Sequence, residues 1–122
     1  MLKRTGTALA ATLLLAGTAY AQTSLTEIGD DVTVSPFNMT ADEIEDMDVY
    51  DGNGTEVGEV DDVLGSDPQT PTHIEVNFDD DAASTYPDRD DVVVPISNFS
   101  LLNNRLTVDL SPEEVQNLPV RN

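Results

Sequence analysis

Hydrophobic and polar residues alternate on both sides of an Asn-Gly pair over residues 49–64 of the chain. An Asn-Gly pair between two alternating runs is typical of a β-hairpin, because both residues tolerate the positive φ angles of a tight turn. The pattern therefore predicts an antiparallel hairpin that turns at Asn53-Gly54. Gly58 lies inside the second strand, where it indicates a bulge or the close approach of another backbone.

The same alternation predicts further short strands after this hairpin. Three segments carry the signal, at residues 72–78, 92–94 and 106–110. In the first of them, Ile74, Val76 and Phe78 form the buried face, which leaves His73, Glu75 and Asn77 on the other. Residues 65–71 and 79–91 are predicted to be loops, the second long and acidic, and Asn103-Asn104 a second tight turn.

Two short helices are predicted from their amino-terminal signals. Thr40 with Glu43 fits a capping box ahead of a helical turn over 41–45, which places Ile44 inward. Ser111 with Pro112 and Glu114 begins a second helix that Pro119 ends. Together these elements predict a mainly β fold, a small antiparallel β-barrel with a short N-terminal helical turn and a short C-terminal helix.

The amino terminus has the pattern of a secretory signal peptide over residues 1–21. Lys3 and Arg4 precede an apolar stretch over 8–16, and Ala19-Tyr20-Ala21 forms a small-x-small cleavage site, so cleavage is expected after Ala21. An uncleaved membrane anchor is the alternative, but the apolar stretch is shorter than the roughly 20 residues that cross a bilayer. The predicted product is therefore periplasmic or secreted, without direct insertion into the membrane.

Between the signal peptide and the folded domain, residues 22–39 are predicted to be a flexible tether. Val32 and Val34 alternate, but Pro36 interrupts the pattern before Phe37. The folded domain is expected over residues 40–120.

Charge narrows the range of partners. The chain carries 5 Lys and Arg against 24 Asp and Glu, a net charge of −19, and removal of residues 1–21 leaves three arginines and a net charge of −21. Nucleic acids and anionic lipid surfaces are poor candidates, since binding them requires clustered Lys or Arg.

High acidity with few aromatic residues is also typical of disorder, but the spaced Val, Ile and Leu residues after Met39 argue against it. Acidity without lysine favours adaptation to high salt, where the Debye length falls from about 8 Å at physiological ionic strength to about 3 Å at 1 M. The chain has no cysteine, which excludes disulfides, thiol catalysis and thiolate metal sites.

The order of elements resembles the PRC-barrel family. The resemblance rests on DVYD at 48–51, Gly54, VGEVDDV at 57–63, IEV at 74–76, VVVP at 92–95, LTVDL at 106–110 and the Pro112-Glu113-Glu114 helix with Pro119. It extends over residues 40–120 and implies a non-catalytic binding or assembly module, because the family has no shared active site. An exported, strongly acidic chain departs from the family's cytoplasmic members, so the resemblance identifies no partner.

Calcium binding is the main alternative to a role as a binding or assembly module. Five polar residues occupy liganding offsets of a helix-loop-helix calcium loop: Asp51, Asn53, Thr55, Glu59 and Asp62. Glu56 stands where that loop needs glycine, so a hairpin turn with solvated acids is the favoured interpretation. The acidic loop over 79–91 is a better place for a weak divalent-cation site.

No residue is assigned to catalysis, to a cofactor or to a metal. His73 lacks imidazole or thiolate neighbours in the sequence and is predicted to face solvent. Asp61 and Asp62 are adjacent on a strand and are predicted to point to opposite faces, unlike the paired acids of a glycosidase. Phe99 is predicted to belong to the core, while Tyr50 and Tyr86 are candidate anchors for an unknown protein partner.

Overall fold

A computed structural model describes residues 25–79 and 85–121 of the chain. The predicted signal peptide lies outside the described residues. The strands are β2 (Thr26–Glu27), β3 (Thr33–Val34), β4 (Met39–Thr40), β5 (Asp48–Tyr50), β6 (Glu56–Asp67), β7 (Thr70–Phe78), β8 (Arg89–Pro95), β9 (Phe99–Leu102) and β10 (Arg105–Val108). The helices are α2 (Ala41–Glu45), the 3-10 helix η2 (Ile96–Asn98) and α3 (Pro112–Gln116). The mainly β prediction is confirmed.

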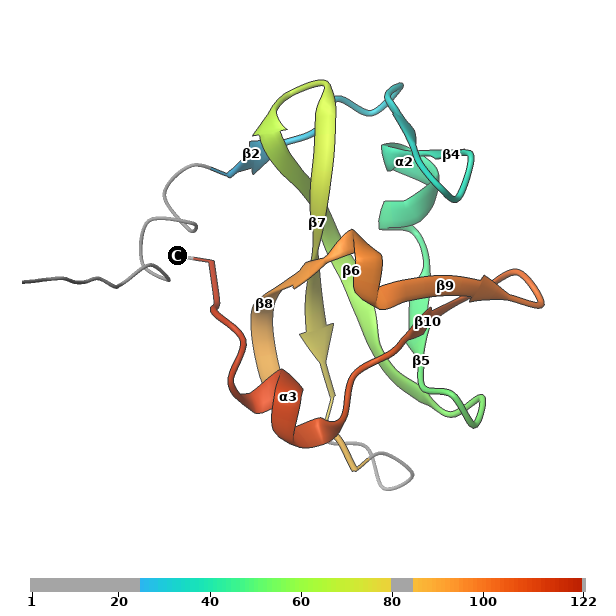
Figure 1. Ribbon diagram of the computed structural model, residues 1–122, viewed down its shortest axis with the longest axis vertical. Coiled ribbons are helices and arrows are strands. Elements are labelled where there is room, and N and C mark those ends of the chain that lie inside the picture. Colours follow the sequence, from blue (N-terminus) through green and yellow to red (C-terminus); the bar gives the residue numbers. More distant parts are fainter. Residues whose placement is uncertain (1–24, 80–84, 122) are drawn as a thin grey trace, which may run out of the picture.

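The main sheet has the strand order β8-β7-β6-β5-β10-β9, and β2 pairs with β6 off this path (Figure 1). Neighbours are antiparallel except β5 and β10, which run parallel with Leu106 opposite Val49. Within the described residues no ladder joins β8 to β9, so the predicted closed antiparallel barrel is not observed. Instead η2 carries the chain from one end of the sheet to the other.

The hairpin at the centre of the sequence pattern is confirmed. β5 and β6 pair in antiparallel register with Asp48 opposite Glu59. One Asp51 carboxylate oxygen accepts hydrogen bonds from the amides of Asn53 and Thr55, at 2.9 and 3.0 Å. Gly54 supplies the positive φ angle of the turn, at 84°. A Cβ on Gly58 would lie 2.4 Å from the Asn77 carbonyl oxygen, which is the close backbone approach predicted there.

Residues 65–71, predicted to be a loop, belong mostly to strands. β6 continues to Asp67 and β7 begins at Thr70, so only two residues form the turn. The Asp67 carboxylate holds this turn by accepting from the Gln69 amide at 2.8 Å and from the Thr70 hydroxyl at 3.1 Å. The turn-forming residues were identified correctly, but their side-chain hydrogen bonds tighten the connection more than composition indicated.

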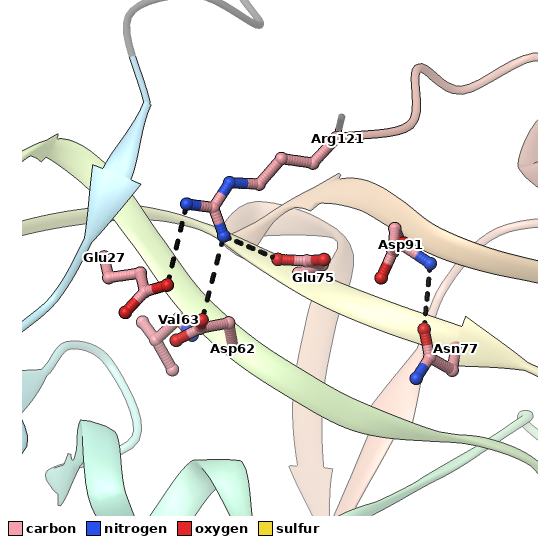
Figure 2. A network of polar contacts seen from close by, with 7 residues as sticks. All are labelled: Glu27, Asp62, Val63, Glu75, Asn77, Asp91 and Arg121. Atoms are coloured by element: carbon pink, nitrogen blue, oxygen red, sulfur yellow. Dashed lines mark hydrogen bonds and ion pairs between the residues drawn. The ribbon is translucent and has the colours of Figure 1, made fainter.

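The acidic loop predicted over 79–91 is shorter than expected at its end, because β8 already begins at Arg89. Asp91 has a positive φ of 58° within that strand, and its amide donates to the Asn77 side chain at 2.8 Å (Figure 2). The register between β7 and β8 shifts at this place, as expected for a bulge.

Residues after β8 form a second hairpin. Asn103 and Asn104, with φ angles of 55° and 65°, make the predicted tight turn between β9 and β10. Two successive positive φ angles are those of a type I′ turn, whose twist matches the twist of paired strands. The hairpin projects from the body of the molecule (Figure 1).

Both predicted capping boxes are confirmed. The Thr40 hydroxyl accepts from the Glu43 amide while the Glu43 carboxylate accepts from the Thr40 amide, at 3.2 and 2.9 Å. Ser111 and Glu114 make the same exchange at 3.1 and 2.8 Å. The buried residues Ile44 and Val115 attach the two helices to the core.

The segment predicted to be a tether is packed against the domain from Thr26 onward. Ile28, Val34 and Phe37 belong to the hydrophobic core. β2 pairs with β6, and the Ile28 amide donates to the Val63 carbonyl at 2.9 Å. Pro36 does not exclude this packing, because it lies in the turn between the short strands β3 and β4.

Candidate functional site

The projecting β9–β10 hairpin lies beside a surface depression of about 300 Å³. The depression is lined by residues from the β5–β6 turn and from the hairpin: Tyr50, Asp51, Gly52, Asn53, Gly54, Leu102, Asn103, Arg105 and Thr107. Two tight turns therefore meet at one end of the sheet, since β10 pairs with β5. We call β9, its turn and this depression the β9 surface.

Leu102 is the one large hydrophobic residue exposed in the part of the chain that the structure describes, with 52% of its surface accessible. Its neighbour in the ladder, Arg105, places its guanidinium 4.8 Å from the centre of the Tyr50 ring. Such a cation–π contact holds the arginine over an aromatic face. The β9 surface thus combines an exposed leucine, a half-buried tyrosine and a positive charge.

Acidic residues are missing from this part of the sequence. Residues 92–108 contain no Asp or Glu in a chain with 24 of them. The exposed residues of this range are Ser97, Ser100, Leu102, Asn103, Asn104 and Arg105. The Asp51 carboxylate at the rim of the depression is already engaged by two amides. The β9 surface is therefore far less acidic than the chain as a whole.

The two ends of the sheet differ in how their edges are covered. At β8, the C-terminal segment pairs alongside the strand, with a bridge between Val92 and Val120. The Val93 amide donates to the Pro119 carbonyl at 2.9 Å, and the Arg121 amide to the Asp91 carbonyl at 2.8 Å. At β9, no described residue forms a second ladder. Among residues 25–79 and 85–121, the C-terminal segment covers the β8 edge and nothing pairs with the β9 edge.

A cluster of charges surrounds Arg121 where the C-terminal segment covers the sheet (Figure 2). The guanidinium lies 3.0 Å from a Glu75 carboxylate oxygen, 3.7 Å from Asp62 and 3.7 Å from Glu27. The four side chains come from β2, β6, β7 and the C-terminal segment. We call them the Arg121 cluster.

Burial and a hydrogen bond with the Asp91 carboxyl together raise the pKa of Glu75 to about 7, against the opposing effect of Arg121. Burial and a hydrogen bond with Asp62 likewise raise the pKa of Glu45 to about 7. Both carboxyl groups therefore change protonation near neutral pH. Glu75 is 4% exposed beneath the guanidinium, so it is not presented to a substrate.

A bulge explains how adjacent acids reach the same region. β6 shifts register between Val60 and Asp62, so that Asp61 and Asp62 face Glu75 together. Asp61, Glu75 and Asp91 have carboxylate oxygens within 4.8 Å of one another. The prediction that Asp61 and Asp62 point to opposite faces is therefore wrong, because a bulge re-aims one residue of the strand.

We expect Arg121→Met to destabilise the protein at pH 8 by about 1–3 kcal/mol, below the range for fully buried pairs because the arginine is partly exposed. At pH 5.5 the loss should be smaller. Glu75, with a folded pKa of about 7, is then mostly protonated and needs less neutralisation. Urea unfolding at both pH values and constant salt measures the difference.

Arg105→Met is the matched control, because it removes the same charge from a cation–π contact. It should lose less than about 1 kcal/mol, at either pH. Equal losses for the two variants, or a loss for Arg121→Met that does not depend on pH, would contradict the role given to the Arg121 cluster.

The other candidate residues of the sequence are placed as follows. Phe99 is buried, as predicted. Tyr86 also belongs to the core: its ring stacks on Phe78 with centroids 5.8 Å apart, and its hydroxyl donates to the Leu110 carbonyl.

His73 is half-buried instead of facing solvent, and burial lowers its pKa. Its Nδ1 lies 2.7 Å from the Thr72 hydroxyl. Tyr50, the other candidate anchor, lines the depression beside the β9–β10 hairpin.

The residues with calcium-loop spacing form no such loop. They lie on a hairpin, and Asp51, the first of them, uses its carboxylate to hold the turn. Of the acidic loop over 79–91, residues 80–84 lie outside the described residues. Asp91, at the end of this loop, lies close to the carboxylates of Asp61 and Glu75.

Sequence reasoning missed Arg121, Glu75 and Leu102. Arg121 had one signal, since it is among three cations after residue 21. Glu75 had none, because its burial depends on a segment 46 residues away. Leu102 lies outside the segments predicted to be strands, although the Asn103-Asn104 turn that follows it was predicted.

The sequence model of the PRC-barrel domain matches residues 38–115, well over half of the chain. The chain belongs to the PRC-barrel family. The match includes β5 to β10 and begins at Asn38, so the short strand β2 and the C-terminal segment of this PRC-barrel protein lie outside it. A search of curated proteins finds no match to this chain.

Among the described residues, no helix has the length and apolar character that crossing a membrane requires.

Proposed function

We propose that this PRC-barrel protein is an exported, non-catalytic binding or assembly module that makes protein–protein contacts at the cell envelope or in the periplasm. Membership of the family supports a binding role. The signal-peptide pattern over residues 1–21 supports export. The observation that carries the proposal is the β9 surface, where an unpaired strand edge, exposed Leu102 and the Tyr50–Arg105 contact lie together.

The features of the β9 surface are those of an interaction site. Tyrosine and arginine are enriched where binding energy concentrates, and here both lie beside an exposed leucine. An open strand edge offers backbone hydrogen bonds to a partner. The Arg121 cluster is less suited to contact, because its buried carboxylate is already covered by the arginine.

Affinity capture from the envelope fraction of the producing cell, at the salt of its growth medium, tests the proposal. Leu102→Glu removes the exposed leucine, and Gln69→Glu adds the same charge at an exposed turn between β6 and β7. We expect a protein retained by the wild type and by Gln69→Glu but lost by Leu102→Glu. A set of bound proteins unchanged among the three chains would overturn the proposal.

A second candidate function is weak binding of a divalent cation such as calcium through the acidic loop over 79–91. The observation in its favour is that Asp91 lies with Asp61 and Glu75 in one carboxylate group. Arg121, 3.0 Å from Glu75, already supplies positive charge to that group and would compete with a cation. The binding module is therefore the favoured proposal.

Calorimetric titration with calcium distinguishes the two functions. Saturable heat at micromolar calcium that is lost in Asp91→Asn but kept in Asp109→Asn would favour the cation site. Asp109 is exposed and lies outside the carboxylate group, so it controls for the loss of one charge. The favoured proposal expects no such heat.

Adaptation to high salt is part of the proposal. A net charge of −19, or −21 after cleavage, makes repulsion within the folded chain strong in dilute buffer. We expect the melting temperature to rise as sodium chloride increases into the molar range, by about 4–8 °C for each kcal/mol gained. Differential scanning calorimetry measures it, with potassium chloride expected to act alike. A melting temperature insensitive to salt would refute the adaptation.

A further inference from the structure

We infer that the β9 surface binds a second copy of this chain, through antiparallel pairing of the two β9 edges about a two-fold axis. The inference rests on the proposed assembly role and names its partner. Three observations carry it: the direction of the free backbone groups on β9, the distribution of acidic residues, and the contrast between the two sheet edges.

The hairpin geometry determines which backbone groups of β9 face outward. In a two-residue hairpin the closing residues, here Leu102 and Arg105, exchange hydrogen bonds, and the pairs then alternate along the ladder. The backbone amide and carbonyl of Ser100 therefore point toward β10. Those of Leu101 and Phe99 point away from β10, to the free edge. The Phe99 amide donates to the Ile96 carbonyl. Among the described residues, hairpin alternation therefore leaves Leu101 as the β9 residue whose amide and carbonyl both point to the free edge.

This arrangement favours a self-complementary register. In a two-fold antiparallel pair, one residue lies opposite its own copy and exchanges two hydrogen bonds with it. Pairing centred on Leu101 places Leu102 opposite Ser100 of the partner subunit. Both side chains are exposed in the single chain and point to the same face. The exposed leucine is then covered by a small polar residue, without burying a charge.

The distribution of acids argues for a copy of the same chain. Most faces of one molecule present Asp and Glu, so two copies repel each other in most orientations. Residues 92–108 lack acids, and the β9 surface bears Arg105 as its charged residue from that range. A basic partner would bind better on the acidic faces. The acid-free edge is where two copies approach with least repulsion.

The β8 edge of the sheet shows how this fold protects a strand edge from pairing with another chain. The C-terminal segment covers β8 with backbone hydrogen bonds from Val93 and Arg121. No described segment covers β9, and β9 itself carries no proline or charged residue, which are common means of blocking an edge. In the part of the chain that the structure describes, the short length of β9 is what limits pairing at this edge, which is consistent with reversible association.

Sedimentation equilibrium of the chain as the cell makes it, between 0.1 and about 3 M sodium chloride, tests the inference. The wild type is expected to form dimers, with an association constant that rises with salt because screening weakens repulsion between the copies. Leu102→Glu and Ser100→Glu should each lower that constant about tenfold or more, because each brings acids close together across the axis. Gln69→Glu should leave it within about twofold.

Circular dichroism verifies that the variants keep their strands, which is expected since all three positions are exposed. A wild type that is monomeric at every salt concentration would overturn the inference. So would association that weakens with salt, or that Gln69→Glu reduces as much as Leu102→Glu. If the wild type stays monomeric but captures a different protein that Leu102→Glu loses, the inference fails and the proposed function stands. If the wild type stays monomeric and the affinity capture retains no protein, the inferred dimer and the proposed function both fail.

Discussion

Replacing Phe78 by alanine is expected to lower the free energy of unfolding by about 3–5 kcal/mol, the usual loss for a buried phenylalanine. The Phe78 side chain is completely buried and stacks on the ring of Tyr86. Its removal leaves a cavity at the end of β7, next to Gly58 on the neighbouring strand. Small domains have a total stability of about 5–15 kcal/mol, so this variant should lose a large part of its stability.

Urea unfolding at high salt, where the wild type is most stable in this account, measures the loss. Phe78→Leu is the control, since it keeps most of the apolar volume and should lose clearly less. A loss below about 1 kcal/mol for Phe78→Ala would show that the contact between β7 and the Tyr86 segment is not part of the core.

Gly65→Ala is expected to cost about 3 kcal/mol or more, at the upper end of what overpacking produces. Gly65 is buried where β6 pairs with β7 on one side and with β2 on the other. A Cβ there would lie 1.9 Å from the Thr70 carbonyl oxygen and 2.7 Å from Cδ1 of Ile28. The first contact is with backbone, so relief requires the two strands to separate.

Gly52→Ala is the matched control for this substitution. A Cβ on Gly52 would meet no atom within 4 Å, and its φ is not positive. The change should therefore alter stability by no more than about 1 kcal/mol, in the stabilising direction if the unfolded chain loses freedom. Thermal unfolding of both variants measures this, and a Gly65→Ala chain as stable as Gly52→Ala would refute the close approach of the β7 backbone to Gly65.

The features that were predicted correctly are those encoded within a few residues. Gly54 and the Asn103-Asn104 pair specify turns through the positive φ angles that these residues tolerate. Thr40 and Ser111 begin helices through hydrogen bonds to residues three positions ahead. Local chemistry of this kind can be read from sequence because both partners lie in one short window.

The features that were missed depend on distant segments. Glu75 has the spacing of a solvent-facing residue and is buried because Arg121 and its segment cover that face of β7. Ile28 lies in a polar stretch and enters the core because β2 pairs with the far end of β6. Asp61 turns toward Glu75 because of a bulge, which the regular alternation of a strand does not indicate.

The candidate site likewise has features that the sequence predicted and features that depend on distant segments. Tyr50 was a candidate anchor from its residue type, and it lines the depression. That Arg105 lies over its ring follows from the parallel pairing of β5 with β10, a connection between segments some 50 residues apart. The open β9 edge was not predicted from the sequence either, because a closed barrel was expected and a closed barrel has no edges.

The most direct test of the account is a photo-crosslinking amino acid placed at position 102 in the producing cell, with position 69 as the control site. Both positions are exposed in the single chain, and only the first lies on the β9 surface. Irradiation at the salt of the growth medium is predicted to give a defined protein adduct from position 102, of the size of two chains, and none from position 69. No adduct from position 102, or the same adducts from both positions, would contradict an assembly module that acts through its open strand edge.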